Sequence, residues 1–299
     1  MADANQVEDL KTQEPPRIEV PSGKNAAGEN FPVGSILLPR HLRPHVAIFY
    51  AFARAIDDIA DAQSLEPEEK QIRLEKCASA VQGTLSGNAP PTSDGLEKAH
   101  AMRESLVATG TTARHCLDLI SAFKQDAVKN RYATWNELID YCDRSAAPVG
   151  RYLLDIHGES PALYPLSDAL CNALQVINHL QDCGDDYRVL NRIYLPQEWM
   201  SDARMRDEDL DATKASLGLH QTINLAIIGT NRLLGDAARL PRAMKNRRLA
   251  FETAIILKLA EALSRRLSRE DPLSAPVKLT AREKAKAVVA GLWMVVAGR

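Results

Sequence analysis

The sequence is poor in cysteine and has no excess of either charge, and both shortages exclude classes of protein. Its five cysteines are odd in number and no two have Cys-x-x-Cys spacing, so neither a disulfide framework nor a zinc site is predicted. We expect free thiols in a reducing cytosol. The net charge of −2 provides no broad cationic surface, so neither a nucleic-acid partner nor strong electrostatic docking to anionic lipid is expected.

The sequence also lacks a long apolar run. The N-terminus is polar and acidic, so no secretory signal peptide is predicted, and no segment is long enough to span a bilayer. The most apolar segment, residues 287–297, is expected to be a packed terminal helix, and a peripheral membrane contact there stays open. The predicted location is cytoplasmic, with peripheral attachment at the inner membrane face as the open addition.

Strand signals are missing, because no alternating apolar pattern of useful length occurs. Linker-like stretches are short, so we predict a single all-α domain of stacked helices over residues 28–299. Residues 1–27 are polar and contain several prolines, which predicts a disordered N-terminal arm. The expected helices span about 44–63, a segment from 67, 96–108, 112–129, 135–157 with a kink at Pro148 and Gly150, 162–189, 197–202, 206–216, 219–239, 245–269 and 279–297.

The stretch from Tyr50 to Asp61 places unlike groups on one helical face. Tyr50, Arg54, Asp57 and Asp61 fall on a single stripe at 3.6 residues per turn, and Asp58 lies beside it. Carboxylates one turn apart repel each other, so the pattern costs stability unless a cation binds there. Mg2+ is the cation that carboxylate oxygens suit best.

A second polar stripe lies in the expected helix 162–189. Gln175, Asn178, Asp182 and Asp186 follow the spacing of one helical face. An acidic pattern on one helix is more often a solvated face, but apolar neighbours on both helices indicate that these two are central. Because buried unpaired carboxylates are costly, we predict that both stripes face one cavity and bind Mg2+ ions together with a diphosphate.

This arrangement predicts carbocation chemistry. Metal ions on a diphosphate stabilise the negative charge that builds as its C–O bond breaks. The carbon fragment then needs an apolar, water-poor cavity and aromatic groups that tolerate positive charge. The aromatic candidates, for each of which ordinary core packing is the alternative, are Phe31, Phe49, Tyr50, Tyr141 and Tyr194.

These motifs resemble the squalene/phytoene synthase family, whose members have the all-α isoprenoid synthase fold with helices around a central active-site cavity. The resemblance covers about residues 28–270. It is carried by NFPVGSILLP at 30–39, YxFxRxxDDIxD at 50–61, YCDRSAAPVG at 141–150, QxxNxxxDxxxD at 175–186 and RIYLP at 192–196.

Within the family the sequence is most similar to the branch that makes hydroxysqualene in bacterial hopanoid biosynthesis. The similarity lies in LRPH at 42–45, SAAPVGR at 145–151 and NHLQDCG at 178–184. It implies Mg2+-assisted ionisation of presqualene diphosphate and capture of the rearranged cation by water, without NADPH. It also implies hand-over of substrate from an upstream synthase and of product to a downstream reductase.

The resemblance further implies a role for each site residue. The Mg2+ ligands would be Asp57, Asp58, Asp61, Asp182 and Asp186, with Asn178 near the metal. The substrate contacts would be Arg54 and Arg192 on the diphosphate, Gln175 and Asn178 lining its site, Phe31, Tyr50 and Tyr141 near the carbon chain, and Tyr194 on the flap after the second motif.

Departures from the wider family leave two other functions open. Gln181 stands where many relatives have arginine, and losing that cation is expected to weaken binding of a second diphosphate. This favours one diphosphate substrate, but a head-to-head prenyl transferase that makes presqualene diphosphate, squalene or phytoene stays open. The other alternative is a catalytically silent helical protein that scaffolds partners or carries a prenyl lipid.

Overall fold

The computed structural model describes Ile18 and residues 38–85 and 94–296 of the chain. Within these ranges the protein is all-α, as predicted, and its only sheet-like pairing is an isolated parallel bridge between Arg131 and Ile193. The predicted arm at residues 1–27 and the candidate Phe31 lie outside the described residues, except for Ile18 itself. Ile18 packs against the apolar cluster formed by the first four helices.

The described helices follow one another with short connections. In order along the chain they are α1 (Arg43–Asp61), α2 (Pro67–Gln82), α3 (Glu97–Thr109), α4 (Arg114–Asp126), α5 (Trp135–Ser145), α6 (Ala147–Ile156), α7 (Tyr164–Gln181), α8 (Cys183–Leu190), α9 (Gln197–Asp202), α10 (Leu217–Ala237), α11 (Leu240–Ala243), α12 (Arg247–Leu267) and α13 (Ala281–Val296).

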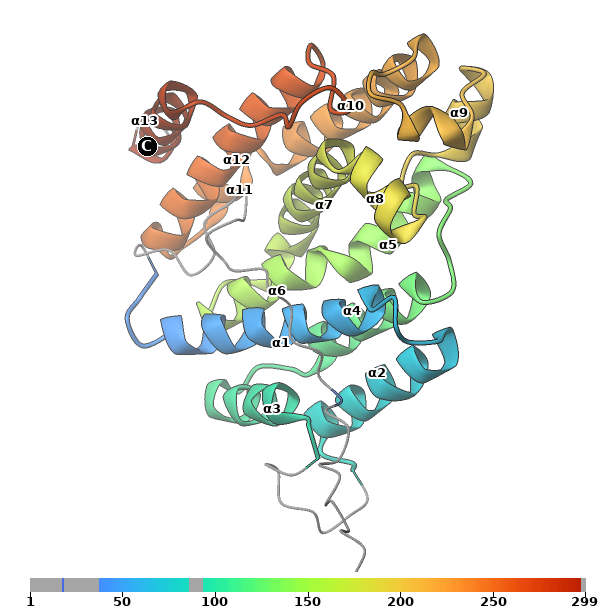
Figure 1. Ribbon diagram of the computed structural model, residues 1–299. Coiled ribbons are helices and arrows are strands. Elements are labelled where there is room, and N and C mark those ends of the chain that lie inside the picture. Colours follow the sequence, from blue (N-terminus) through green and yellow to red (C-terminus); the bar gives the residue numbers. More distant parts are fainter. Residues whose placement is uncertain (1–17, 19–37, 86–93, 297–299) are drawn as a thin grey trace, which may run out of the picture.

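The two largest apolar clusters lie on either side of α5 and α6. Figure 1 shows α1 to α4 on one side of this pair and α7, α10 and α12 on the other. Phe49 of α1 stacks on Tyr152 of α6 with ring centroids 4.1 Å apart, and the Tyr152 hydroxyl donates to the carbonyl of His45 at 3.2 Å. These contacts hold α1 against the central pair, so its polar stripe faces the same interior as α7.

The prediction of a single kinked helix over 135–157 is wrong in one respect, because the structure has two helices there. Ala146 leaves the helical conformation with φ −124° and ψ −47°, and Pro148 lies in the first turn of α6, where its missing N–H leaves no bond unmade. Gly150 then allows α6 to approach α7 closely. A Cβ at this position would lie 2.3 Å from Ser167 Oγ and 2.6 Å from Cys171 Sγ.

The expected helix 162–189 is likewise interrupted, at Asp182, which has φ −103° and ψ 8°. The interruption is small, because the Asp186 N–H still donates to the Asp182 carbonyl at 2.8 Å. Gly184, with a low helix propensity, follows in α8, and a Cβ there would lie 2.6 Å from Leu273. Asp182 and Asp186 therefore remain one turn apart despite the break.

The prediction of a helix over 206–216 is also wrong, because that segment contains only a short 3-10 helix, Asp207–Asp211. The Asp209 carboxylate accepts hydrogen bonds from the Arg206 N–H and, more weakly, from the Ser216 hydroxyl. Acidic side chains that bond to nearby backbone groups compete with helical hydrogen bonding, which explains the shorter element.

Candidate active site

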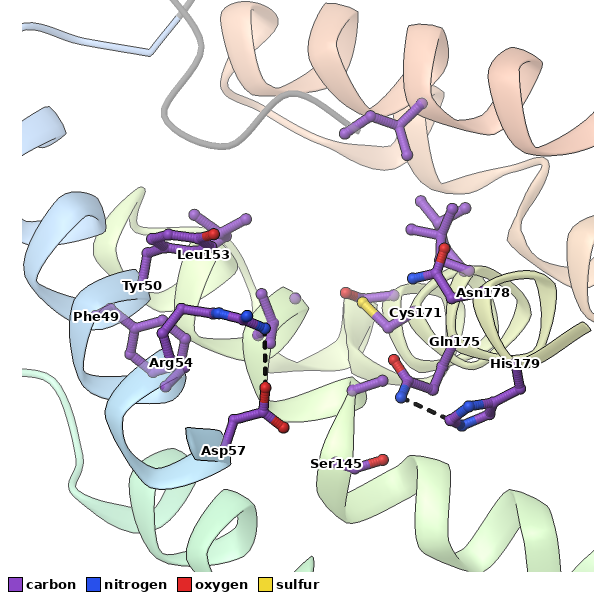
Figure 2. Close-up of a pocket in the computed structure, with 18 of the residues that line it drawn as sticks. Phe49, Tyr50, Arg54, Asp57, Ser145, Leu153, Cys171, Gln175, Asn178 and His179 are labelled. Carbon is purple, nitrogen blue, oxygen red and sulfur yellow. Dashed lines mark hydrogen bonds and ion pairs between the residues drawn. The ribbon is translucent and has the colours of Figure 1, made fainter. Parts of the chain in front are cut away.

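A cavity of about 700 Å³ lies between α1 and α7 and extends to α12. Its wall includes residues of α1, α4 to α8, α11 and α12. Figure 2 shows Arg54 and Asp57 projecting from α1 on one side and Gln175 and Asn178 projecting from α7 on the other. The volume suits a large organic molecule rather than a lone metal ion.

Helix α1 presents its polar stripe to this cavity because its opposite face is buried. Phe52, Ile56 and Ile59 have 0 % exposure and pack in the cluster of α1 to α4. Tyr50, Arg54, Asp57 and Asp61 all line the cavity, whereas Asp58 is not among the lining residues. The role predicted for Asp58 stays a prediction, since its side chain leaves the helix about 100° from that of Asp57.

The second stripe lines the same cavity. Gln175, Asn178, Asp182 and Asp186 are all found in its wall, opposite the stripe of α1. Arg192 and Tyr194, which follow α8, and Tyr141 of α5 also contribute to the lining. The structure thus gathers at one cavity every candidate site residue named from the sequence except Asp58 and the undescribed Phe31.

Two of the acids of α1 are each paired with an arginine. Asp57 accepts a hydrogen bond from Arg54 Nη1 at 2.8 Å, and Asp61 accepts one from Arg192 Nη1 at 2.5 Å. Burial, and next the charge of Asp61, raise the pKa of Asp57 to about 7 in spite of Arg54. Proximity of the two carboxylates therefore favours a bound cation over two free charges.

Arg192 is held deep in the wall rather than extended into the cavity. Its exposure is 6 %, and Nη2 donates to the carbonyl oxygens of Ala60 at 3.3 Å and Asp126 at 3.2 Å. The guanidinium thus connects the end of α1, the end of α4 and the segment after α8. In this arrangement it contacts Asp61, so a direct contact with a diphosphate stays a prediction.

Sequence reasoning missed Asp126, a buried carboxylate in the cavity wall. The Tyr141 hydroxyl donates to Asp126 Oδ2 at 2.6 Å, and burial raises the pKa of Asp126 to about 7. Tyr141 is therefore oriented by a hydrogen bond and is not simply a packed aromatic. No motif marks Asp126 in the sequence, because it is the last residue of α4 and no other acid of the helix lies within one turn of it.

His179 also lines the cavity, as a neutral base. Burial lowers its pKa to about 3, and the nearby Arg192 charge acts in the same direction. Its ring stacks on Tyr194 with centroids 3.5 Å apart, and its Nε2 lies 3.2 Å from Gln175 Nε2. The structure thus places this buried ring in the cavity wall.

The remainder of the cavity is mostly apolar and reaches helices that the sequence did not mark. Helix α12 contributes Glu252, Thr253 and Ile256, which the predicted motifs do not include. The apolar end of the cavity is lined by Leu240, Met244, Leu249 and Ile256. A signal for these residues was absent because α12 carries an ordinary apolar helical pattern.

The cavity wall has an excess of acids, which tests whether Mg2+ fits. Six carboxylates face two guanidinium groups, those of Arg54 and Arg192; the acids are Asp57, Asp61, Asp126, Asp182, Asp186 and Glu252. No three His, Cys, Asp or Glu side chains of the described residues are already gathered as a metal-binding cluster. The chemistry of these carboxylate donors suits Mg2+, which takes a few carboxylates together with phosphate oxygens and water.

Known proteins with similar sequences or structures come from one family of enzymes. The chain matches the model of the squalene/phytoene synthase family over residues 24–283, a range that includes both stripes. It is 43% identical to a hydroxysqualene synthase of Zymomonas mobilis, covering 86% of this chain and 84% of that protein. A hydroxysqualene synthase of Rhodopseudomonas palustris is also 43% identical, with 87% of each chain covered. The crystal structure of squalene synthase HpnC from Alicyclobacillus acidocaldarius is 32% identical, with a TM-score of 0.67, covering 79% of this chain and 87% of that one.

Proposed function

Because the chain belongs to the squalene/phytoene synthase family, we propose that it is a Mg2+-dependent hydroxysqualene synthase. The proposed reaction converts presqualene diphosphate and water into hydroxysqualene and diphosphate. The observation that carries the proposal is the single cavity with two facing acidic stripes and an apolar remainder. Relatives named for this activity are 42% and 43% identical over most of the chain, which supports the choice within the family.

The two stripes supply the proposed Mg2+ ligands. Asp57 and Asp61 on α1 and Asp182 and Asp186 beyond α7 would hold the ions, with Asn178 beside them and Asp58 as a further predicted ligand. Bound Mg2+ supplies electrophilic stabilisation of the departing diphosphate. Arg54, which lines the same end of the cavity, would add a cation to that diphosphate once Asp57 turns to a metal.

The remaining residues would bind the carbon chain and control water. Tyr50, Tyr141 and Tyr194 present aromatic surface to the cavity, which stabilises a passing carbocation. The Tyr141 hydroxyl is held by Asp126, so its ring has one orientation. Neutral His179 and Gln175 form a hydrogen-bonding pair close to these rings, which provides polar groups near the reacting carbon without a competing positive charge.

A reaction with presqualene diphosphate tests this proposal. Purified protein incubated with presqualene diphosphate and Mg2+, without NADPH, is expected to yield a C30 alcohol that mass spectrometry detects. Absence of this alcohol would refute the proposal. No NADPH is required in the proposed reaction, because the product is an alcohol that a separate reductase would consume.

A head-to-head prenyl transferase is the second candidate, because the 32% identical crystal structure is named a squalene synthase. Farnesyl diphosphate supplied alone separates the two functions. The second candidate predicts efficient conversion of farnesyl diphosphate. Our proposal predicts product only when presqualene diphosphate is supplied. Gln181, whose amide donates to the Val277 carbonyl at 2.6 Å, is committed to a structural contact, which agrees with a single diphosphate site.

A further inference from the structure

Helix α13 carries a stripe of apolar side chains that the rest of the described protein does not cover. Among the described residues, five of the fourteen exposed large apolar side chains lie on this one helix, so they form a patch and are not scattered. The most exposed are Trp293 at 70% and Val289 at 67%. We name these five the α13 patch; they are Val288, Val289, Leu292, Trp293 and Val296.

The opposite face of α13 packs closely on α12, which fixes the direction of the patch. Ala287, Gly291 and Val295 are buried at one-turn spacing. A Cβ on Gly291 would lie 2.8 Å from the Ile255 backbone nitrogen, so the two helices nearly touch there. Val295 also packs with Ala250 and Ala254 of α12. Helix α13 is therefore firmly attached through its buried face, and this attachment makes the α13 patch face outward.

Exposed cations border the α13 patch on two sides. On α13 itself, Arg282 and Lys286 precede Val289 and Trp293 along the same helical stripe. Beyond the other end, Arg242 Nε donates to the Met294 carbonyl at 3.3 Å and so joins α11 to the end of α13. The exposed basic residues here, which we name the cationic rim, are Arg242, Lys245, Arg247, Arg248, Arg282, Lys284 and Lys286.

The net charge of the chain is only −2, so the composition does not reveal this local concentration of cations. The one acid in the first turn of α13, Glu283, is already paired with Arg266 at 2.8 Å. We propose that the α13 patch and the cationic rim dock on an anionic lipid bilayer, with Trp293 at the level of the headgroups. Amphipathic helices with basic residues beside apolar and Trp side chains lie in this manner on membranes.

The charges favour a bilayer over a second copy of the chain. A two-fold contact through the α13 patch would bring the two cationic rims together, and like charges across an interface oppose association. An anionic lipid surface instead attracts each of these cations. No helix among the described residues is long and apolar enough to cross a membrane, so the proposal concerns contact at the surface.

The position of the patch also links it to the cavity. Met244 lines the apolar end of the cavity and packs, with Met294, in the cluster that joins α12 to α13. Figure 1 shows α11, α12 and α13 side by side at one edge of the molecule. If the proposed function holds, a bilayer on the α13 patch would lie beside the part of the protein that receives a long hydrocarbon chain.

Flotation with lipid vesicles tests the proposal directly. Wild-type protein is expected to float with vesicles of equal parts phosphatidylcholine and phosphatidylglycerol, and to stay in solution with phosphatidylcholine alone. The double variant Val289→Glu/Trp293→Glu should lose binding at least tenfold. Lys245→Glu/Arg248→Glu should lower binding by about 25-fold or more, because each of the two lost cations contributes about fivefold near an anionic surface and the new carboxylates are repelled by it.

A matched control is available outside the α13 patch. Val107 of α3 is 75% exposed and Val128, which follows α4, is 70% exposed. Val107→Glu/Val128→Glu therefore adds the same two charges to exposed apolar sites and should bind vesicles as the wild type does. Circular dichroism checks that each variant is folded. Equal flotation of wild type and Val289→Glu/Trp293→Glu would overturn the proposal. Failure of the wild type to float with anionic vesicles would also overturn it.

Two further readouts separate this proposal from its alternatives. A dimer that dissociates in Val289→Glu/Trp293→Glu, seen by light scattering, would show that a second copy covers the patch and would overturn the proposal. Turnover of presqualene diphosphate in detergent micelles should be unchanged in this variant but should fall with vesicle-borne substrate. A wild type without turnover in micelles would refute the proposed function alone, since flotation reports on the docking surface independently.

Discussion

Arg192 offers the sharpest test of how the acidic stripe of α1 is stabilised. Its Nη1 contacts Asp61 at 2.5 Å, and Nη2 donates to two backbone carbonyls. Arg192→Met keeps the aliphatic length but removes the charge and all three bonds. Breaking a fully buried ion pair costs about 3–5 kcal/mol. Because the Asp61 side chain is 29% exposed, water compensates part of that loss, and we expect a loss of about 2 kcal/mol in the free energy of unfolding.

Denaturant unfolding followed by circular dichroism measures this value, and a double-mutant cycle assigns its cause. Asp61→Asn/Arg192→Met leaves neither charge unpaired, so it should be at least about 1 kcal/mol more stable than the sum of the two single changes predicts. Two results would refute the reasoning. One is an Arg192→Met variant within about 0.5 kcal/mol of wild type, and the other is strict additivity in the cycle.

Three further changes test other parts of the account. Asp182→Asn should lower product formation by roughly a hundredfold or more, while Asp185→Asn, whose side chain is 77% exposed, should leave it nearly unchanged; a comparable loss in both would contradict the assignment. The Asp126 pKa is raised from 3.8 to about 7, so the native state binds more protons than the unfolded state between these values and stability should fall as pH rises through that range. Asp126→Asn should flatten this dependence in denaturant titrations at several pH values, and an unchanged slope would count against it. Gly150→Ala should cost about 1–3 kcal/mol by crowding α7. Its control Gly235→Ala, with nothing within 4 Å of the new Cβ, should stabilise α10 by up to about 1 kcal/mol; equal effects would refute the close approach of α6.

The all-α fold and the meeting of the two stripes were predictable from the sequence because both depend on helical periodicity. Tyr50, Arg54, Asp57 and Asp61 are spaced so that any helix places them on one face, and the apolar residues between them require burial of the other face. Since α1 lies at the centre of the fold, its polar stripe faces an interior space.

Local breaks were harder to predict, because they depend on tertiary contacts. The kink expected from Pro148 became a full interruption at Ala146, a residue with high helix propensity. Asp182 also interrupts a helix whose apolar pattern continues past it. Pro148 and Gly184 mark both places in the sequence, but they do not determine how far the helix departs from regular geometry there.

The sequence also could not identify residues that function by long-range pairing. Asp126 matters because Tyr141 and the Arg192 guanidinium meet it from distant parts of the chain. Similarly, the cations of the rim are separated along the chain and become neighbours only when α11 meets the end of α13. Net charge and motif spacing contain no information about either arrangement.

We propose above all that the stripes of α1 and α7–α8 together hold metal ions and a diphosphate within one cavity. Crystals grown with Mn2+ in place of Mg2+ and with inorganic diphosphate would test it through anomalous scattering. The account predicts manganese peaks between Asp57 and Asp61 on one side and Asp182 and Asp186 on the other, bridged by the diphosphate. Peaks outside this cavity, or diphosphate bound with no metal at either stripe, would contradict it.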